Sequence, residues 1–259
     1  MSYHNLIVEK EGEVALVTVN RPRVLNALKS EVLKELSEAF VHLNGDQGVR
    51  VIILTGSGKA FIAGADILEM KDFTSEQARE FATLGHMTMD AIQNSEKPVI
   101  AAINGFALGG GFELALACDI ILASETAKLG VPEVNLGLIQ GFGGTQRLPR
   151  LVGKALAKEL IFTADAIDAK RAYEMGIVNR VFSPGELLPE AKKMAKKIAE
   201  KGPVALKLAK RAIDGGYNKE LSRGCALEID AFVECFTTSD GKEGMNAFLE
   251  KRKPVFKNQ

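Results

Sequence analysis

Apolar positions along the chain follow two alternating patterns, and together these predict an α/β fold. Short apolar runs indicate buried strands, and they lie at 50–56, 97–103 and 119–124. Between them, helical spacing predicts a helix over 30–43, a polar helix around 75–94 and a glycine-led helix at about 110–118. Strands that alternate with helices favour buried sheets covered by helices.

The first 43 residues carry two more local signals. The apolar runs at 6–10 and 13–20 flank Glu11-Gly12, which predicts a β-hairpin. Ser30 begins the helical pattern at 30–43, two residues before its first apolar position, so we expect it to be the N-cap residue.

The pattern of apolar and polar positions changes after Gly202-Pro203. The stretches 204–213, 220–236 and 241–253 all have helical patterns, and none of them has a strand signal. We therefore predict an α/β core over 1–200 and a helical region over 201–259 that packs on the core or on a neighbouring subunit.

Composition and charge exclude several function classes. The chain has 259 residues, of which 46% are hydrophobic and 25% charged, as in ordinary globular proteins. Its 33 basic residues balance 33 acidic ones, so no net field attracts nucleic acid or an anionic membrane. We expect neither as a partner.

The cysteines and the N-terminus indicate a cytoplasmic protein. Cys118, Cys225 and Cys235 form no CxxC pair, so we expect neither a disulfide framework nor a metal site. The N-terminus lacks a signal-peptide pattern, and polar residues and glycines interrupt the longest apolar stretch, at 99–123.

Common catalytic motifs are absent from the sequence. The segment 55–61 lacks the spacing of a phosphate-binding P-loop, and 141–146 lacks the third glycine of a dinucleotide-binding loop. The three histidines are scattered, and no GxSxG motif occurs. Nucleotide, zinc and serine-hydrolase chemistry are therefore disfavoured.

Two glutamates lie in unusually apolar surroundings. Glu113 follows three glycines in "ALGGGFELALACD" (107–119), and Glu133 lies in "KLGVPEVNLGLIQGFGG" (128–144). Taken singly, each has an ordinary explanation, as a helix-start acid and as an exposed loop charge. Their separation nevertheless allows them to meet across a pocket, where the N–H groups of Gly109–Gly111 could stabilise a negatively charged oxygen.

A second loop offers similar backbone donors. Ala63-Gly64-Ala65-Asp66 follows the strand at 50–56 and is small enough for a ligand to contact its backbone. A helix N-cap would explain Asp66 without any function.

Four blocks of the sequence resemble the crotonase superfamily, and within it the short-chain enoyl-CoA hydratases. The blocks are "FIAGADILEM" (61–70), "PVIAAINGFALGGGFELALACDIILAS" (98–124), "LGVPEVNLGLIQGFGGTQRLPRLVG" (129–153) and "GMNAFLEKRKPVF" (244–256). The resemblance covers essentially the whole chain. It implies a crotonase-type (ClpP-like) spiral of ββα units with a C-terminal helical trimerisation region, and a homotrimer or a homohexamer.

The resemblance also assigns residues to a site. It implies that Glu113 and Glu133 are catalytic and that the N–H groups of Ala65 and Gly110 form an oxyanion hole. The ligand would lie along Ala65, Asp66, Ile67 and Leu68, with Gly141 near the catalytic water and with Phe248 and Lys251 reaching coenzyme A from a neighbouring subunit.

The reaction implied is the reversible syn addition of water to a 2-trans-enoyl-CoA, which gives a 3-hydroxyacyl-CoA. Glu133 would handle the proton at C2 and Glu113 the water, and partial burial is expected to raise the pKa of a glutamate in this role. Coenzyme A enters as part of the substrate, and we expect no cofactor.

Related activities are the alternatives. Isomerases of the superfamily typically carry an apolar residue in place of Glu113, so the presence of both glutamates favours hydration over isomerisation or thioester hydrolysis. One branch of the superfamily binds RNA through a lysine-bearing helix, but here the matching helix at 30–43 carries Lys34 among Glu31, Glu35 and Glu38.

Three positions depart from the pattern of the closer hydratases. Val131 and Gln140 stand where those enzymes commonly have Gln and Pro, and Leu68 stands where some have Lys. These departures concern chain-length preference and coenzyme A contacts.

Overall fold

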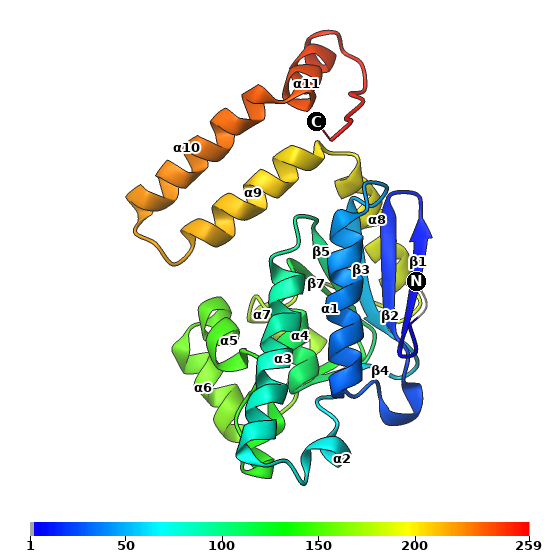
Figure 1. Ribbon diagram of the computed structural model, residues 1–259, viewed down its shortest axis with the longest axis vertical. Coiled ribbons are helices and arrows are strands. Elements are labelled where there is room, and N and C mark those ends of the chain that lie inside the picture. Colours follow the sequence, from blue (N-terminus) through cyan, green and yellow to red (C-terminus); the bar gives the residue numbers. More distant parts are fainter. Residues whose placement is uncertain (1–2, 259) are drawn as a thin grey trace.

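The core of the protein is built on a large sheet (Figure 1). The structure, a computed structural model, describes residues 3–258, and within them this sheet has six strands. In spatial order the strands are β1 (Leu6–Glu11), β2 (Val14–Val19), β3 (Val51–Gly56), β5 (Val99–Ile103), β7 (Ile120–Ser124) and β10 (Arg180–Phe182). The β1–β2 pair is antiparallel, which confirms the predicted hairpin, and every other pair in this sheet is parallel.

The strands of a second, smaller sheet alternate along the chain with those of the large sheet. It contains β4 (Ala60–Ile62), β6 (Phe106–Leu108), β8 (Lys128–Gly130) and β9 (Ile167–Asp168). β4, β6 and β8 run parallel, and each of them follows one strand of the large sheet and precedes a helical segment. The chain therefore winds as a spiral of ββα units, as expected for the crotonase fold.

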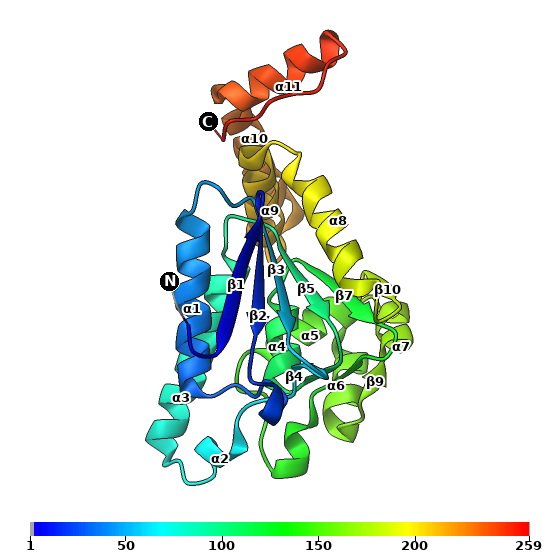
Figure 2. The same cartoon turned by 90° about the vertical axis from the view of Figure 1, so that its right-hand side faces the viewer.

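Helices cover both faces of the large sheet (Figure 2). The core helices are α1 (Ser30–Gly45), α2 (Ile67–Met70), α3 (Ser75–Gln93), α4 (Gly110–Leu116), α5 (Gly144–Val152), α6 (Lys154–Thr163), α7 (Ala169–Glu174) and α8 (Leu187–Ala199). Because side chains alternate along a strand, Ile52 and Leu54 join the apolar cluster on the α1 and α3 side, whereas Val51 and Ile53 pack with α8.

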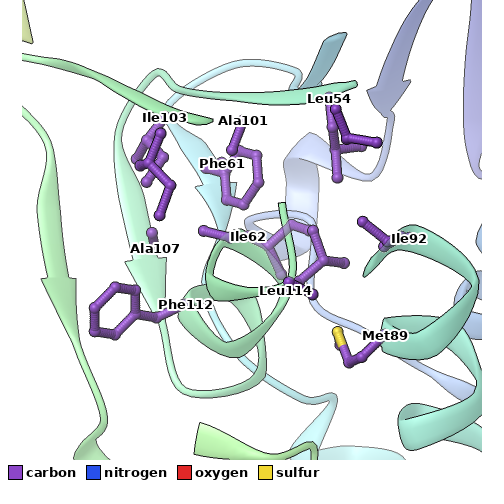
Figure 3. Close-up of a cluster of buried hydrophobic side chains, with 14 of the residues drawn as sticks. Leu54, Phe61, Ile62, Met89, Ile92, Ala101, Ile103, Ala107, Phe112 and Leu114 are labelled. Carbon is purple, nitrogen blue, oxygen red and sulfur yellow. The ribbon is translucent and has the colours of Figure 1, made fainter. Parts of the chain in front are cut away.

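α4 lies inside the protein, surrounded by strand and helix side chains (Figure 3). Phe112 and Leu114 of this helix are fully buried. A Cβ atom on Gly111 would lie 2.0 Å from the carbonyl oxygen of Ile62 in β4, so only glycine allows this close approach. Any polar residue on α4 is therefore held in an apolar environment.

The prediction for the start of α1 is wrong in one detail. Ser30 is the first helical residue rather than the N-cap, and Lys29 in the cap position makes no side-chain cap hydrogen bond. The N–H of Ser30 instead donates to Oε2 of Glu69 at 2.9 Å. A carboxylate from α2, distant in sequence, thus replaces the local cap.

The C-terminal region is helical, as predicted. α9 (Pro203–Gly216), α10 (Leu221–Thr237) and α11 (Ser239–Leu249) extend away from the core (Figures 1 and 2), and the structure places no strand between residues 200 and 258. Within residues 3–258, no helix combines the length and apolar character needed to cross a membrane.

Candidate active site

The candidate site lies where the chain leaves three neighbouring strands, β4, β6 and β8. The loop 63–66 follows β4, Gly109 and α4 follow β6, and Glu133 follows β8 in a 3-10 turn over Pro132–Leu136. Because β4, β6 and β8 are parallel and adjacent, these segments leave the small sheet at the same edge.

A glycine allows these segments to touch. Gly109 has φ +49°, a left-handed conformation that favours glycine. A Cβ atom there would lie 2.9 Å from Oε1 of Glu133 and 3.7 Å from the Cα of Gly64. The backbone of Gly109 is therefore the meeting point of the three segments.

Two backbone N–H groups face this region without an acceptor. Leu28 pairs with the strand-like segment at Ala65, donating to Gly64 at 2.9 Å and accepting from Asp66 at 2.8 Å, so the N–H of Ala65 points to the other side. Gly110 begins α4, where N–H groups have no intrahelical acceptor. Among residues 3–258, no acceptor bonds to either N–H.

Glu113 is almost completely enclosed, with 1% of its surface exposed. Its Oε1 accepts hydrogen bonds from the N–H of Phe142 at 2.8 Å and of Gly144 at 2.6 Å. Burial raises the pKa of Glu113 to about 7, the charge of Glu133 adds to this rise, and the two N–H groups oppose it. The carboxyl group can therefore hold or release a proton near neutral pH.

Glu133 is partly buried, and one of its oxygens is also held. Nε2 of Gln140 donates to Oε2 of Glu133 at 2.8 Å. Burial raises the pKa of Glu133, and the hydrogen bond from Gln140 opposes that rise. In the described part of the chain, no other residue donates to Oε1 of Glu133 or to Oε2 of Glu113, so each glutamate keeps one oxygen open.

The sequence pattern does not reveal several residues of this arrangement. The segment 141–146 lacks the pattern of a dinucleotide-binding loop, but it supplies the two N–H groups that hold Glu113. Arg147 of α5 donates to the carbonyl of Phe142 at 2.9 Å and lowers the pKa of Glu113 through its charge. The run of glycines was the only available signal, because it shows that the backbone itself makes the close contacts.

Comparison with known proteins identifies the family. The model of the enoyl-CoA hydratase/isomerase family matches residues 9–259. The chain belongs to this family.

Full-length relatives agree with this assignment. The chain is 52% identical over 257 residues to a crotonyl-CoA hydratase from Syntrophomonas wolfei, covering 99% of both chains. It is also 52% identical over 261 residues to a short-chain-enoyl-CoA hydratase from Clostridium acetobutylicum, covering 100% of both. The crystal structure of an enoyl-CoA hydratase from Bacillus anthracis superimposes with a TM-score of 0.96 at 44% identity, covering 99% of this chain and 100% of that one.

Other residues predicted from the family resemblance border the same edge of the small sheet. Asp66 lies at the cap position of α2, but its carboxylate pairs with Arg21 at 3.1 Å and makes no cap hydrogen bond. Ile67 and Leu68 follow it on α2, and Leu68 is 78% exposed. Gly141 is exposed, with nothing within 4 Å of the position of a Cβ atom.

Two residues predicted from the family resemblance do not join the site within one chain. Phe248 lies on α11 and is 82% exposed, and Lys251 follows the end of that helix. Figures 1 and 2 show α11 at the opposite end of the molecule from α2.

Proposed function

We propose that the protein hydrates 2-trans-enoyl-CoA thioesters reversibly, by syn addition, to 3-hydroxyacyl-CoA. One observation carries the proposal: two buried or partly buried glutamates each keep one open oxygen beside a pair of unengaged backbone N–H groups. The names of the two 52% identical relatives support a short-chain substrate.

The N–H groups of Ala65 and Gly110 would bind the thioester oxygen. Negative charge grows on that oxygen when water attacks C3 of the conjugated thioester. Fixed donors stabilise this charge without reorganisation, and the loss of one such donor typically costs ~10²–10³ in rate.

The glutamates would exchange the protons. Oε2 of Glu113 takes one proton from the water as its oxygen bonds to C3, while Oε1 of Glu133 delivers a proton to C2. The net change is the addition of one water molecule, and one proton remains on the pair. Hydration thus requires a pair that carries one proton, and that proton must lie on Glu133 when the water attacks. The near-neutral pKa of Glu113 keeps one proton on the pair up to about pH 7, and the proton must pass from Glu113 to Glu133 before hydration.

A direct assay tests the function. Purified protein with crotonyl-CoA is expected to remove the enone absorbance and form 3-hydroxybutyryl-CoA. Glu113→Gln is expected to lose at least ~10²-fold in kcat, because a positioned acid or base typically contributes that much. Glu159→Gln, an exposed change on α6, is the matched control.

Three results would contradict hydration. Folded wild-type protein that leaves the enone signal unchanged would rule it out. A shift of the double bond would indicate an isomerase, and release of free coenzyme A would indicate a thioester hydrolase. Wild-type turnover by Glu113→Gln would remove the proposed role of that residue.

We further propose a homotrimer, or a homohexamer built from two trimers, in which a neighbouring subunit brings Phe248 and Lys251 to the coenzyme A. Large exposed apolar side chains on the tail helices support this: Ile213, Tyr217, Leu221, Ile229, Phe232, Val233, Phe236, Met245, Phe248 and Leu249. Contiguous exposed apolar surface of this kind marks protein interfaces.

We also propose that no cofactor is required beyond the coenzyme A of the substrate, so activity should persist after dialysis against a chelator.

A further inference from the structure

We propose that Gln140 is a positioning residue that fixes the carboxylate of Glu133 and leaves Oε1 as the oxygen that exchanges the proton at C2. The inference rests on the proposed hydratase function and adds to it a residue outside the two glutamates and the oxyanion donors.

The amide nitrogen of Gln140 is fully engaged. The side chain is only 5% exposed, and Nε2 donates to Oε2 of Glu133 at 2.8 Å and to the carbonyl of Val131 at 3.3 Å. Both acceptors require a donor, so they fix which end of the amide faces Glu133. A bond from an N–H to a carboxylate is also stronger than one between neutral groups.

The other end of the amide has no partner. Oε1 of Gln140 is buried and, within residues 3–258, accepts no hydrogen bond. A buried acceptor without a donor costs about 1–3 kcal/mol, so a side chain selected for stability alone would not be expected here. The chain tolerates this cost at the position where the amide nitrogen meets Glu133.

Gln140 also lies against the second glutamate. A Cβ atom on Gly144 would be 3.0 Å from Cγ of Gln140 and 3.0 Å from Cγ of Glu113, so both side chains border the same point. The five-residue segment 140–144 therefore holds both carboxylates, Glu133 through a side chain and Glu113 through backbone N–H groups.

With Oε2 held, Oε1 of Glu133 is directed to the backbone of Gly109. A Cβ atom there would lie 2.9 Å from this oxygen. Gly110, the next residue, is the proposed oxyanion donor, so Oε1 lies beside the thioester end of the bound substrate. C2 is the carbon attached to the thioester carbonyl, which makes this the oxygen suited to its proton.

A purely structural role for Gln140 is the competing explanation, because its bond to Val131 also closes the loop 131–140. The two explanations differ in pH dependence. The titratable group that interacts with Glu133 is Glu113 on α4. Arg147 on α5 is a cation close enough to Glu113 to lower its pKa. Loss of the Gln140 donor destabilises ionised Glu133, whereas loss of a loop contact leaves its ionisation unchanged.

Gln140→Met tests the proposal, because methionine keeps the length of the stem and removes the donor. We expect kcat for crotonyl-CoA hydration to fall about 10–100-fold, with KM changing less than about 3-fold, since a misplaced catalytic group can cost about 10²-fold. At low pH, kcat/KM should fall as Glu133 becomes protonated while Glu113 is still protonated. Because loss of the Gln140 donor raises the pKa of Glu133, this acid limb of the kcat/KM profile should move to higher pH. Gln146→Met, an exposed change in the same region, should leave all three quantities unchanged.

Gln140→Asn is the second variant, used also if the first does not fold. Its amide is too short to keep the bond to Glu133, so it should show the same loss of kcat and the same movement of the acid limb. An unchanged acid limb, or a loss confined to KM or thermal stability, overturns the proposal. Wild-type protein without hydratase activity contradicts the proposed function instead, so the two failures are distinguishable.

Discussion

The burial of Glu113 links catalysis to stability at the scale of a single residue. Its pKa in the folded protein is raised to about 7 by burial, whereas an unfolded chain has its usual value near 4.5. A group whose pKa is raised on folding favours the folded state at low pH. This contribution is fully present below about pH 4.5 and is lost as the pH rises through about 7.

Replacement of Glu113 by Gln should therefore stabilise the protein in alkaline solution while it abolishes activity. Gln keeps an oxygen for the N–H groups of Phe142 and Gly144 but has no charge to bury. We expect Glu113→Gln to unfold at a temperature several degrees above wild type at pH 8, a gain of roughly 2–3 kcal/mol, and to differ little at pH 5. Calorimetric melting of both proteins at both pH values measures this. If the variant and wild type differ in unfolding temperature by the same amount at pH 5 and pH 8, the assigned ionisation is contradicted.

The same ionisation sets an alkaline limit on turnover. Above the pKa of Glu113 the pair loses its shared proton, so kcat/KM for crotonyl-CoA should fall with increasing pH from about 7. Steady-state kinetics between pH 5 and 10 measure this alkaline fall in kcat/KM. A profile that is flat from pH 6 to 9 would show that one proton on the pair is not required.

At the scale of elements, α3 helps to position the segment that holds Glu113. A Cβ atom on Gly85 of α3 would lie 2.0 Å from Cδ1 of Phe142. The Phe142 ring is also 5.3 Å from that of Phe81 on the same helix. The close approach of α3 therefore fixes the residue whose N–H bonds to Glu113.

Gly85→Ala is expected to lower both stability and activity. The added methyl group forces the Phe142 ring to move, and overpacking of this kind costs typically ~1–3 kcal/mol. Gly45→Ala, at the exposed end of α1 with open space around it, is the matched control. Adding Phe142→Leu should recover part of the lost stability; no recovery would show that the Phe142 contact is not the cause.

The sequence predicted elements that leave a periodic signal. The apolar runs at 50–56 and 97–103 are strands, and 30–43 lies within α1. β4, β6 and β8 have three residues each, which is too few to show a period. The sequence pattern therefore does not predict the small sheet, whose strand ends carry the site residues.

The two glutamates stood out because their neighbours are apolar, but what holds them could not be read from sequence. The donors to Glu113 are backbone N–H groups, and a sequence does not give their direction. Gln140 was noticed only as a departure from the family pattern, since its contact with Glu133 depends on the return path of the loop.

At the scale of the whole molecule, the tail helices present apolar side chains that the core does not cover. Phe232 and Phe236 of α10 are exposed, with ring centroids 5.0 Å apart. The tail extends from the core and packs on it little (Figure 1), so a single subunit leaves this surface in water.

The double variant Phe232→Glu/Phe236→Glu should dissociate the assembly. We expect wild-type protein to sediment as a trimer or hexamer and this variant as a monomer, because six or more charges would have to be buried at the interface. Its KM for the coenzyme A thioester should rise as the partner's Phe248 and Lys251 are lost. Phe162→Glu, an exposed change on α6, is the matched control. A monomeric wild type would contradict the proposed assembly.

The backbone donors to Glu113 have a consequence for mutational scanning. The hydrogen bonds from Phe142 and Gly144 survive any replacement, other than by proline, that preserves the path of the chain. An alanine scan of 141–144 would therefore report packing and backbone conformation, and it would miss the contribution of these N–H groups to catalysis. Replacement of the residue-144 amide by an ester, which removes that N–H alone, would reveal it.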